Sequence, residues 1–224
     1  MKSRSFTFGE TSVMAFLPET PVSVSVWTVL SPEEAAAVYE KLSEPRPALF
    51  SLSVDWNRDL SPWKSPAVFG NEDFSGGADI FLAQLTQNII PSVEKKVSVP
   101  DGKRMLVGYS LAGLFSVYAF YKTDCFTAGA SLSGSLWFDG FLDYIKVRPF
   151  ARKPAAFCFS LGDREKKTKN RRMQTVEAAT EEAAGLFRSL DVLTDFHLVP
   201  GGHFNDVEKR IADGINWLLS QKLD

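Results

Sequence analysis

Ser110 is the residue whose neighbours most clearly suggest chemistry. It stands in the run Gly108-Tyr109-Ser110-Leu111-Ala112, with apolar residues at 105–107 before it and an apolar pattern of helical spacing after it. This pattern predicts a strand, a sharp turn and a helix, and such a turn needs small residues two positions on either side of the serine. Free N–H groups at the start of a helix favour developing negative charge. The run predicts a nucleophilic serine, although a five-residue pattern of this kind also arises by chance.

A serine hydroxyl needs a base, and His203 is the candidate. Serine attacks an acyl carbon efficiently only when a neutral imidazole removes its proton. Of the two histidines, His197 lies inside the last strand-like run and is expected to be structural, whereas His203 follows that run and Gly201-Gly202. Functional groups of open α/β sheets gather at the carboxyl ends of strands. We therefore expect His203 to act as the base.

A carboxylate must hold this imidazole in the right tautomer, and one loop offers two of them. The loop Gly162-Asp163-Arg164-Glu165 follows another strand-like run. Its spacing favours Glu165, which stands three residues after the glycine, and Asp163 stays the alternative. The chain order of serine, acid and histidine is the order found in α/β-hydrolase triads.

The other groups of the site are predicted from their positions alone. A tetrahedral oxyanion needs two donors, for which we expect the backbone N–H of Leu111 and one near the end of the strand at 22–30, placed at Val29. No His-Gly-Gly-Gly motif marks the second donor. Four side chains are expected to contact substrate, and the two tryptophans among them could equally be loop anchors: Tyr109, Trp56, Arg58 and Trp137.

The patterns of strands and helices alternate from residue 22 to the end of the chain, after a predicted hairpin at 5–17. Strands are expected at 22–30, 48–54, 105–107, 126–132, 155–161 and 192–199. Helices are expected after the capping residue Ser31, at 78–97 with a kink at Pro91, at 111–122, at 173–190 and at 206–219. Such alternation predicts an α/β fold with a mostly parallel sheet covered by helices on both faces, in one domain spanning 1–224 with minimal or no cap domain.

Composition narrows the range of partners. The chain has 224 residues, of which 45% are hydrophobic and 23% charged, and a formal net charge of −2. These values suit a globular protein and give no overall field that would attract nucleic acid or an anionic membrane. With no apolar leader and no apolar run of membrane-spanning length, a cytoplasmic location is expected. Cys125 and Cys158 lack metal-ligand spacing and are expected to be reduced thiols.

Four segments together resemble a known family. They are Gly108-Tyr109-Ser110-Leu111-Ala112-Gly113, Arg58-Asp59-Leu60-Ser61-Pro62, Gly162-Asp163-Arg164-Glu165 and Gly201-Gly202-His203. They are similar to motifs of an esterase family of α/β-hydrolases that includes enterochelin and other ferric-siderophore esterases and esterase D-like enzymes. The resemblance implies a serine carboxylic-ester hydrolase without metal or cofactor, with catalytic roles for Ser110, His203 and Glu165. Ala112 replaces the usual second glycine and no cap domain is present, so a siderophore substrate does not follow.

The sequence therefore favours an esterase that acts on small-molecule esters through an acyl-enzyme. Two alternatives remain open at this point. One is a non-catalytic binding protein with the same fold, and the other is a peptidase or acyltransferase. The sequence carries no pattern that indicates an oligomeric state, and a homodimer is possible.

Overall fold

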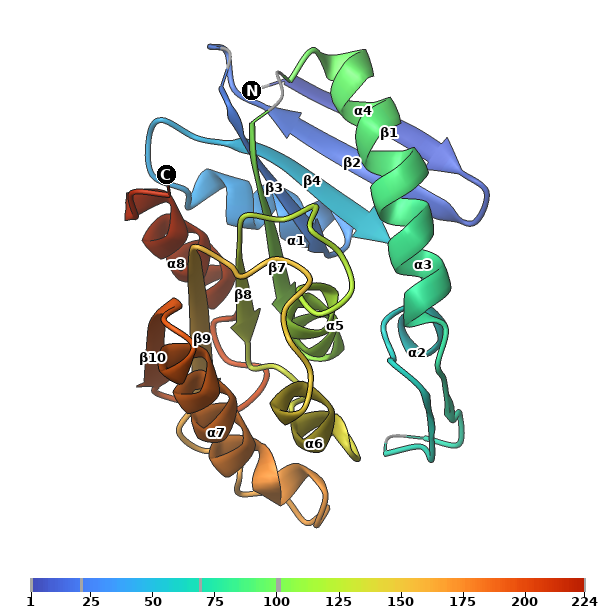
Figure 1. The fold of residues 1–224 in the computed structure, drawn as a ribbon. Helices are drawn as coiled ribbons and strands as arrows, with labels where there is room; N and C mark the ends of the chain where they lie inside the picture. Colours follow the sequence, from blue (N-terminus) through green and yellow to red (C-terminus); the bar gives the residue numbers. More distant parts are fainter. Residues whose placement is uncertain (1, 21, 69, 100–101, 224) are drawn as a thin grey trace.

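An eight-stranded sheet runs through the computed structural model, which describes residues 2–20, 22–68, 70–99 and 102–223 (Figure 1). The strand order is β1-β2-β4-β3-β7-β8-β9-β10. Strand β2 runs antiparallel to its two neighbours, β1 and β4, and the strands from β4 to β10 in this order are parallel. The strands are β1 (Lys2–Phe8), β2 (Thr11–Leu17), β3 (Val24–Val29), β4 (Ala48–Ser53), β7 (Lys103–Tyr109), β8 (Ala128–Leu132), β9 (Ala156–Gly162) and β10 (Leu193–Val199).

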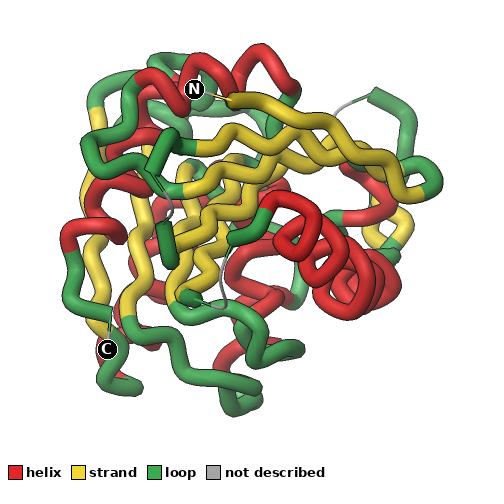
Figure 2. The backbone as a smooth tube through the Cα atoms, turned by 90° about the horizontal axis from the view of Figure 1, so that it is seen from above, coloured by secondary structure: helices red, strands yellow, loops and turns green. Residues whose placement is uncertain are grey.

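Helices cover both faces of the sheet, so the predicted α/β fold is confirmed (Figures 1 and 2). One face packs against α1 and α8 through a cluster that includes Val38 and Ile215, and the other packs against α3, α4, α5 and α7. No helix in the described ranges is long and apolar enough to cross a membrane. The helices are α1 (Pro32–Glu40), α2 (Trp56–Asp59), α3 (Ala78–Gln84), α4 (Ile90–Val97), α5 (Leu111–Ala119), α6 (Phe141–Lys146), α7 (Val176–Ser189) and α8 (Val207–Ser220).

Local sequence explains where several elements begin. The Ser31 hydroxyl accepts the backbone N–H of Glu34 while the Glu34 side chain accepts that of Ser31, which is the capping box expected at the start of α1. Between α3 and α4 the chain passes through a π-helical turn, Leu85–Ile89, immediately before Pro91. Proline lacks an N–H and its ring clashes with the carbonyl four residues earlier, so the helix expected at 78–97 departs from regular α-helical hydrogen bonding just before it.

Two regions differ from the sequence-based expectation. The stretch 55–77, for which the sequence patterns predict neither a strand nor a helix, contains α2 and a small antiparallel pair, β5 (Lys64–Ser65) with β6 (Phe74–Ser75). Helix α6 was not expected at all. It has only six residues, and its N-cap Gly140 offers no capping side chain, so it lacks the usual start signal. Cys125 and Cys158 are free thiols, as expected.

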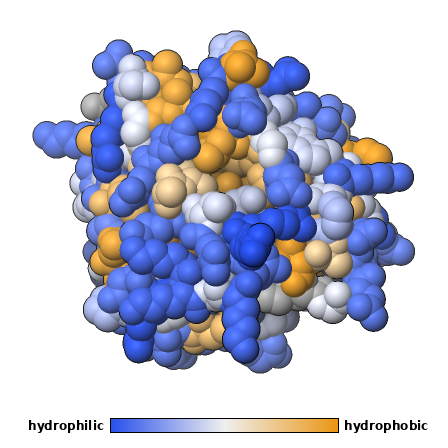
Figure 3. Space-filling model, turned by 90° about the horizontal axis from the view of Figure 1, so that it is seen from below, coloured by the Kyte–Doolittle hydropathy of each residue, from blue (hydrophilic) through white to orange (hydrophobic). Residues whose placement is uncertain are grey.

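The parallel strands all end on one side of the molecule, where the predicted site residues should gather. Viewed from that side, the surface is mainly hydrophilic around a hollowed area in which hydrophobic residues are visible (Figure 3). The residues that follow β7, β8, β9 and β10 form this end of the sheet. The predicted nucleophile, acid and base all lie in those connections.

Candidate active site

Ser110 occupies a strained turn between β7 and α5. Its backbone angles are φ 56° and ψ −122°, a left-handed conformation that costs a non-glycine residue free energy and is found mainly at functional sites. A Cβ atom at Gly108 would lie 1.9 Å from the carbonyl oxygen of Ala112, so only glycine fits there. The Ser110 N–H donates to the Leu132 carbonyl (3.1 Å), and the Ser110 carbonyl accepts from Ser135 (2.9 Å). The end of β8 thus holds the turn in place.

His203 lies between Ser110 and Glu165. Its Nε2 atom is 3.0 Å from the Ser110 Oγ, and its Nδ1 atom is 2.7 Å from Oε2 of Glu165. If Nδ1 carries the proton, it donates to the carboxylate, and Nε2 is free to accept the hydroxyl proton of Ser110. The three side chains therefore form one continuous chain of hydrogen bonds.

The structure brings Glu165, and not Asp163, to the imidazole. The second oxygen of Glu165, Oε1, accepts from the Ser133 hydroxyl at 2.6 Å and from the Gly162 N–H at 2.8 Å. Asp163 is exposed, and its Oδ1 accepts instead from the backbone N–H of Gly201 at 2.9 Å. Asp163 thus braces the loop that leads to His203 from outside the chain of hydrogen bonds.

The surroundings of Glu165 keep it ionised. Burial by itself would raise the pKa of this carboxyl, because a charge is poorly solvated in the interior. The hydrogen bonds from His203 and Ser133 oppose that effect, and they hold the pKa of Glu165 below its ordinary value. At neutral pH the residue is a carboxylate that accepts hydrogen bonds with both oxygens.

Sequence reasoning missed two residues around this acid, Ser133 and Arg210. Ser133 follows β8 with φ 48°, a sharp turn that aims its hydroxyl at Glu165. Arg210 lies on α8 and is only 4% exposed, with Nη1 3.3 Å from Oε1 of Glu165. The sequence does carry a sign that Arg210 is buried. It stands three residues after Val207 and four before Gly214, on the stripe of α8 that faces the core.

The two predicted oxyanion donors, Leu111 and Val29, stay predictions, and both lie near the turn that holds Ser110. Leu111 is the first residue of α5, where backbone N–H groups have no partner within the helix. Val29 is the last residue of β3 and pairs with Leu52 of β4, and the neighbouring Thr28 pairs with Val107 of β7. This register places Val29 level with Gly108, two residues before Ser110.

A small cavity of about 30 Å³ adjoins the serine. Of the four predicted substrate contacts, only Trp137 lines it. Trp56 is 39% exposed on α2, and Arg58 is ion-paired with Asp59 (2.7 Å) and Glu10 (2.8 Å). The Tyr109 hydroxyl donates to the backbone carbonyl of His203 at 2.6 Å. The residues that line the cavity are Ser110, Ser133, Ser135, Trp137, Glu165, Met173, Val176 and His203.

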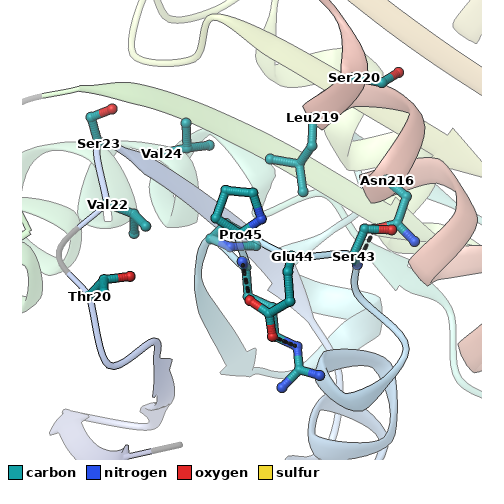
Figure 4. Close-up of a pocket in the computed structure, with 12 residues that line it drawn as sticks. Thr20, Val22, Ser23, Val24, Ser43, Glu44, Pro45, Asn216, Leu219 and Ser220 are labelled. Atoms are coloured by element: carbon teal, nitrogen blue, oxygen red, sulfur yellow. Dashed lines mark hydrogen bonds and ion pairs between the residues drawn. The ribbon is translucent and has the colours of Figure 1, made fainter.

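A larger hollow, of about 580 Å³, lies at the opposite end of the strands (Figure 4). Its walls come from the start of β3, the loop at 43–47 and the end of α8, with apolar side chains such as Val24 and Leu219. The charged residues on it, Glu44 and Arg46, pair with each other at 3.3 Å. Among the described residues that line it there is no histidine or cysteine, and none of Ser110, Glu165 and His203 is among them.

One further cluster has side chains of the kind that bind metals. Among the residues described, only Cys158, Asp195 and His197 bring three such ligand atoms within 4.8 Å of one another. They lie on β9 and β10 and do not line the Ser110 cavity. The Cys158 thiol is fully buried, which raises its pKa, and His197 Nδ1 is already 2.8 Å from Asp195.

Comparisons with known proteins agree with this architecture. No protein-family model matches the chain. A siderophore enterobactin esterase from Emericella nidulans is 32% identical over 126 residues, which are 52% of this chain and 42% of that protein. The matched segments span less than half the length of the curated relatives.

Solved structures match over nearly the whole chain. Siderophore hydrolase EstA from Aspergillus nidulans has a TM-score of 0.75 at 19% identity, covering 98% of this chain and 95% of that one. An IroE-like serine hydrolase from Shewanella oneidensis has a TM-score of 0.81 at 19% identity, covering 97% and 79%. The chain therefore has an α/β-hydrolase fold; part of its sequence is similar to a siderophore enterobactin esterase, and its structure is similar to a siderophore hydrolase and an IroE-like serine hydrolase.

Proposed function

We propose that this chain is a serine hydrolase that cleaves carboxylic esters of small molecules. The observation that carries the proposal is the hydrogen-bond chain from Ser110 through His203 to Glu165, with distances of 3.0 and 2.7 Å. Such a chain, beside a helix N-terminus and a cavity, is the arrangement that acyl transfer needs. The similarity to siderophore esterases and serine hydrolases supports the same conclusion.

The proposed reaction has two halves. The Ser110 Oγ attacks the ester carbonyl carbon as His203 Nε2 removes its proton, and the backbone N–H of Leu111 donates to the oxyanion. Collapse of the tetrahedral intermediate breaks the bond to the alcohol oxygen, which takes the proton from the imidazolium and leaves an acyl-serine. Water then attacks the acyl-serine with His203 again as base, which releases the acid and restores Ser110. Glu165 stabilises the imidazolium in both halves.

The cavity beside Ser110 favours a short acyl group. A water molecule requires about 10–15 Å³ of such volume, so 30 Å³ has room for a group of only a few non-hydrogen atoms. Trp137 closes part of it and is itself only 9% exposed, with the Arg172 guanidinium 5.5 Å from its ring centre. An acetyl-sized group fits this space, and the alcohol portion of the ester would extend to the surface.

Ester turnover tests the proposal. Wild type, Ser110→Ala and the exposed control Ser189→Ala would be assayed on p-nitrophenyl esters of graded chain length and on a siderophore trilactone. We expect turnover in wild type and Ser189→Ala, and its loss in Ser110→Ala. Competing amines and alcohols, with product analysis, would separate hydrolysis from acyl transfer. A folded wild type with no turnover on any ester, thioester or amide would favour the non-catalytic alternative.

A further inference from the structure

Arg210 connects the acid to the rest of the site through a buried guanidinium. Its Nη1 atom lies 3.1 Å from the Ser133 hydroxyl, 3.3 Å from Oε1 of Glu165 and 3.3 Å from the Tyr109 hydroxyl. We propose that Arg210 is a positioning residue that holds Glu165 and the His203 loop in the geometry needed for proton transfer. This inference rests on the proposed function, because it assigns Arg210 a part in the same reaction.

The other nitrogen of the guanidinium holds the loop that carries His203. Its Nη2 atom donates to the backbone carbonyls of Pro200 (3.2 Å) and Gly202 (3.1 Å). Tyr109 extends the same network, because its hydroxyl donates to the His203 carbonyl. Burial raises the pKa of Tyr109, so this hydroxyl stays protonated at neutral pH. The Arg210 side chain, on α8, thus contacts the last residue of β7 and the loops that follow β8, β9 and β10.

Gly162 leaves the room that this arrangement needs. A Cβ atom there would lie 2.5 Å from the Gly201 carbonyl oxygen, 2.9 Å from Oε1 of Glu165 and 3.1 Å from Nη2 of Arg210. Any side chain at this position would displace the Glu165 carboxylate, the Arg210 guanidinium or the Gly201 carbonyl. The close approach of the three groups therefore depends on the glycine that ends β9.

A guanidinium suits this position better than an ammonium group would. A buried charge is tolerated only when its hydrogen-bonding capacity is used, and the four Nη hydrogens of Arg210 lie among five acceptor atoms, three near Nη1 and two near Nη2. Lysine in its place keeps the positive charge but cannot reach both Glu165 and the two loop carbonyls. The titratable or charged groups near Glu165 are His203, Arg210 and Tyr109, and the other contacts are the hydroxyl of Ser133 and the N–H of Gly162.

Two substitutions distinguish the effect of the positive charge of Arg210 from the effect of its planar guanidinium group. In Arg210→Lys, kcat should fall by about tenfold to a hundredfold with KM nearly unchanged, because charge-assisted hydrogen bonds that order the loop are lost. The acid limb of the kcat/KM pH profile should stay in place. In Arg210→Met the loss should be larger, and the acid limb should move to higher pH, because without the nearby cation the coupled His203–Glu165 pair binds its proton more tightly. Lys209→Met, a change at an exposed position one residue earlier, is the matched control and should behave as wild type.

A spectroscopic readout makes the test independent of turnover. The Nδ1 proton that His203 shares with Glu165 should give a downfield NMR signal, assigned by its loss in Glu165→Gln. We expect this signal in wild type and Lys209→Met, and its loss or displacement in Arg210→Met. If wild type shows the signal and its dependence on Arg210 but hydrolyses nothing, the proposed function fails and the positioning role stands.

Several outcomes would overturn the inference. An unchanged kcat in Arg210→Lys would show that catalysis does not need the planar set of guanidinium N–H groups. In a folded Arg210→Met, an unmoved acid limb together with an unmoved downfield signal would show that Arg210 acts on neither the acid nor the histidine. If Arg210→Met does not fold, Arg210→Lys decides, because it keeps the buried charge and removes only the planar set of guanidinium N–H groups.

Discussion

The hydroxyl oxygen of Ser110 lies 3.0 Å from Nε2 of His203, although 93 positions of sequence separate the two residues. The sheet brings them together, because β7 ends at Tyr109 and β10 ends at Val199 on the same side of the molecule. The strained backbone of Ser110 presents the hydroxyl beyond the strand end. This relationship is the basis of the predictions that follow.

Glu165 should serve as the acid of the proposed triad. Replacing Glu165 with Gln removes the carboxylate that orients the imidazole, so kcat should fall by about 10³–10⁴-fold, the loss seen when a serine protease loses its aspartate. Asp163→Asn is the matched control, because the Asp163 carboxylate accepts from the loop backbone and pairs with a neighbouring arginine, outside the hydrogen-bond chain of Ser110, His203 and Glu165. Steady-state kinetics on p-nitrophenyl acetate would measure both. A loss confined to Asp163→Asn would reverse the assignment.

Glu165 should also make stability depend on pH. Its pKa is lowered in the folded state, so it contributes stability that is present above the ordinary glutamate pKa, about 4.3, and is lost as pH falls through the lowered value. Denaturant unfolding of wild type and Glu165→Gln across this acidic range would measure the effect. We expect the free energy of unfolding to fall more steeply with decreasing pH in wild type. Parallel curves would contradict the lowered pKa.

Trp137 should limit the length of the acyl chain. Trp137→Ala would enlarge the cavity beside Ser110, so the ratio of kcat/KM for p-nitrophenyl butyrate to that for the acetate should rise by about tenfold or more, as expected for extra methylene groups that gain a pocket. Trp56→Ala is the control, because Trp56 is exposed and outside the cavity. If the ratio of kcat/KM for butyrate to that for acetate changed in Trp56→Ala alone, the acyl group would bind near Trp56 and not in the cavity beside Ser110.

Gly108 should tolerate no side chain. Gly108→Ala would put a Cβ atom 1.9 Å from the Ala112 carbonyl oxygen, so the free energy of unfolding should fall by more than about 3 kcal/mol, at or beyond the upper end of ordinary overpacking. Ala112→Gly, on the other side of the turn, removes atoms and should cost about 1 kcal/mol through helix propensity. Thermal and denaturant melts would compare the two. Equal stabilities would argue against the close approach at this turn.

The sequence was sufficient to predict the fold class and the residues that meet at Ser110. Each of these residues follows a strand-like run and stands within three residues of a glycine, which is a local signal readable without the structure. The alternation of strands and helices predicted the parallel sheet, and the capping residue Ser31 predicted the start of α1. These features depend on residues close to one another in the chain.

The features that were missed depend on contacts between distant segments. Arg210 lies on the core-facing stripe of α8, but this spacing does not show which groups its guanidinium contacts when α8 packs against the strand ends. Tyr109 was expected to contact substrate, but its hydroxyl donates a hydrogen bond to the backbone carbonyl of His203, which is 94 positions later in the sequence. Arg58 likewise pairs with Glu10 from the β1–β2 turn. Only the folded arrangement shows which polar partner each side chain finds.

The most direct test of the central claim is to locate the nucleophile chemically. The folded protein would be treated with a fluorophosphonate, and peptide mass spectrometry would find the modified residue. We expect one phosphonylated serine, Ser110, with labelling lost in Ser110→Ala and retained in Ser189→Ala. Labelling that persists in Ser110→Ala, or that falls on another serine of wild type, would contradict the account.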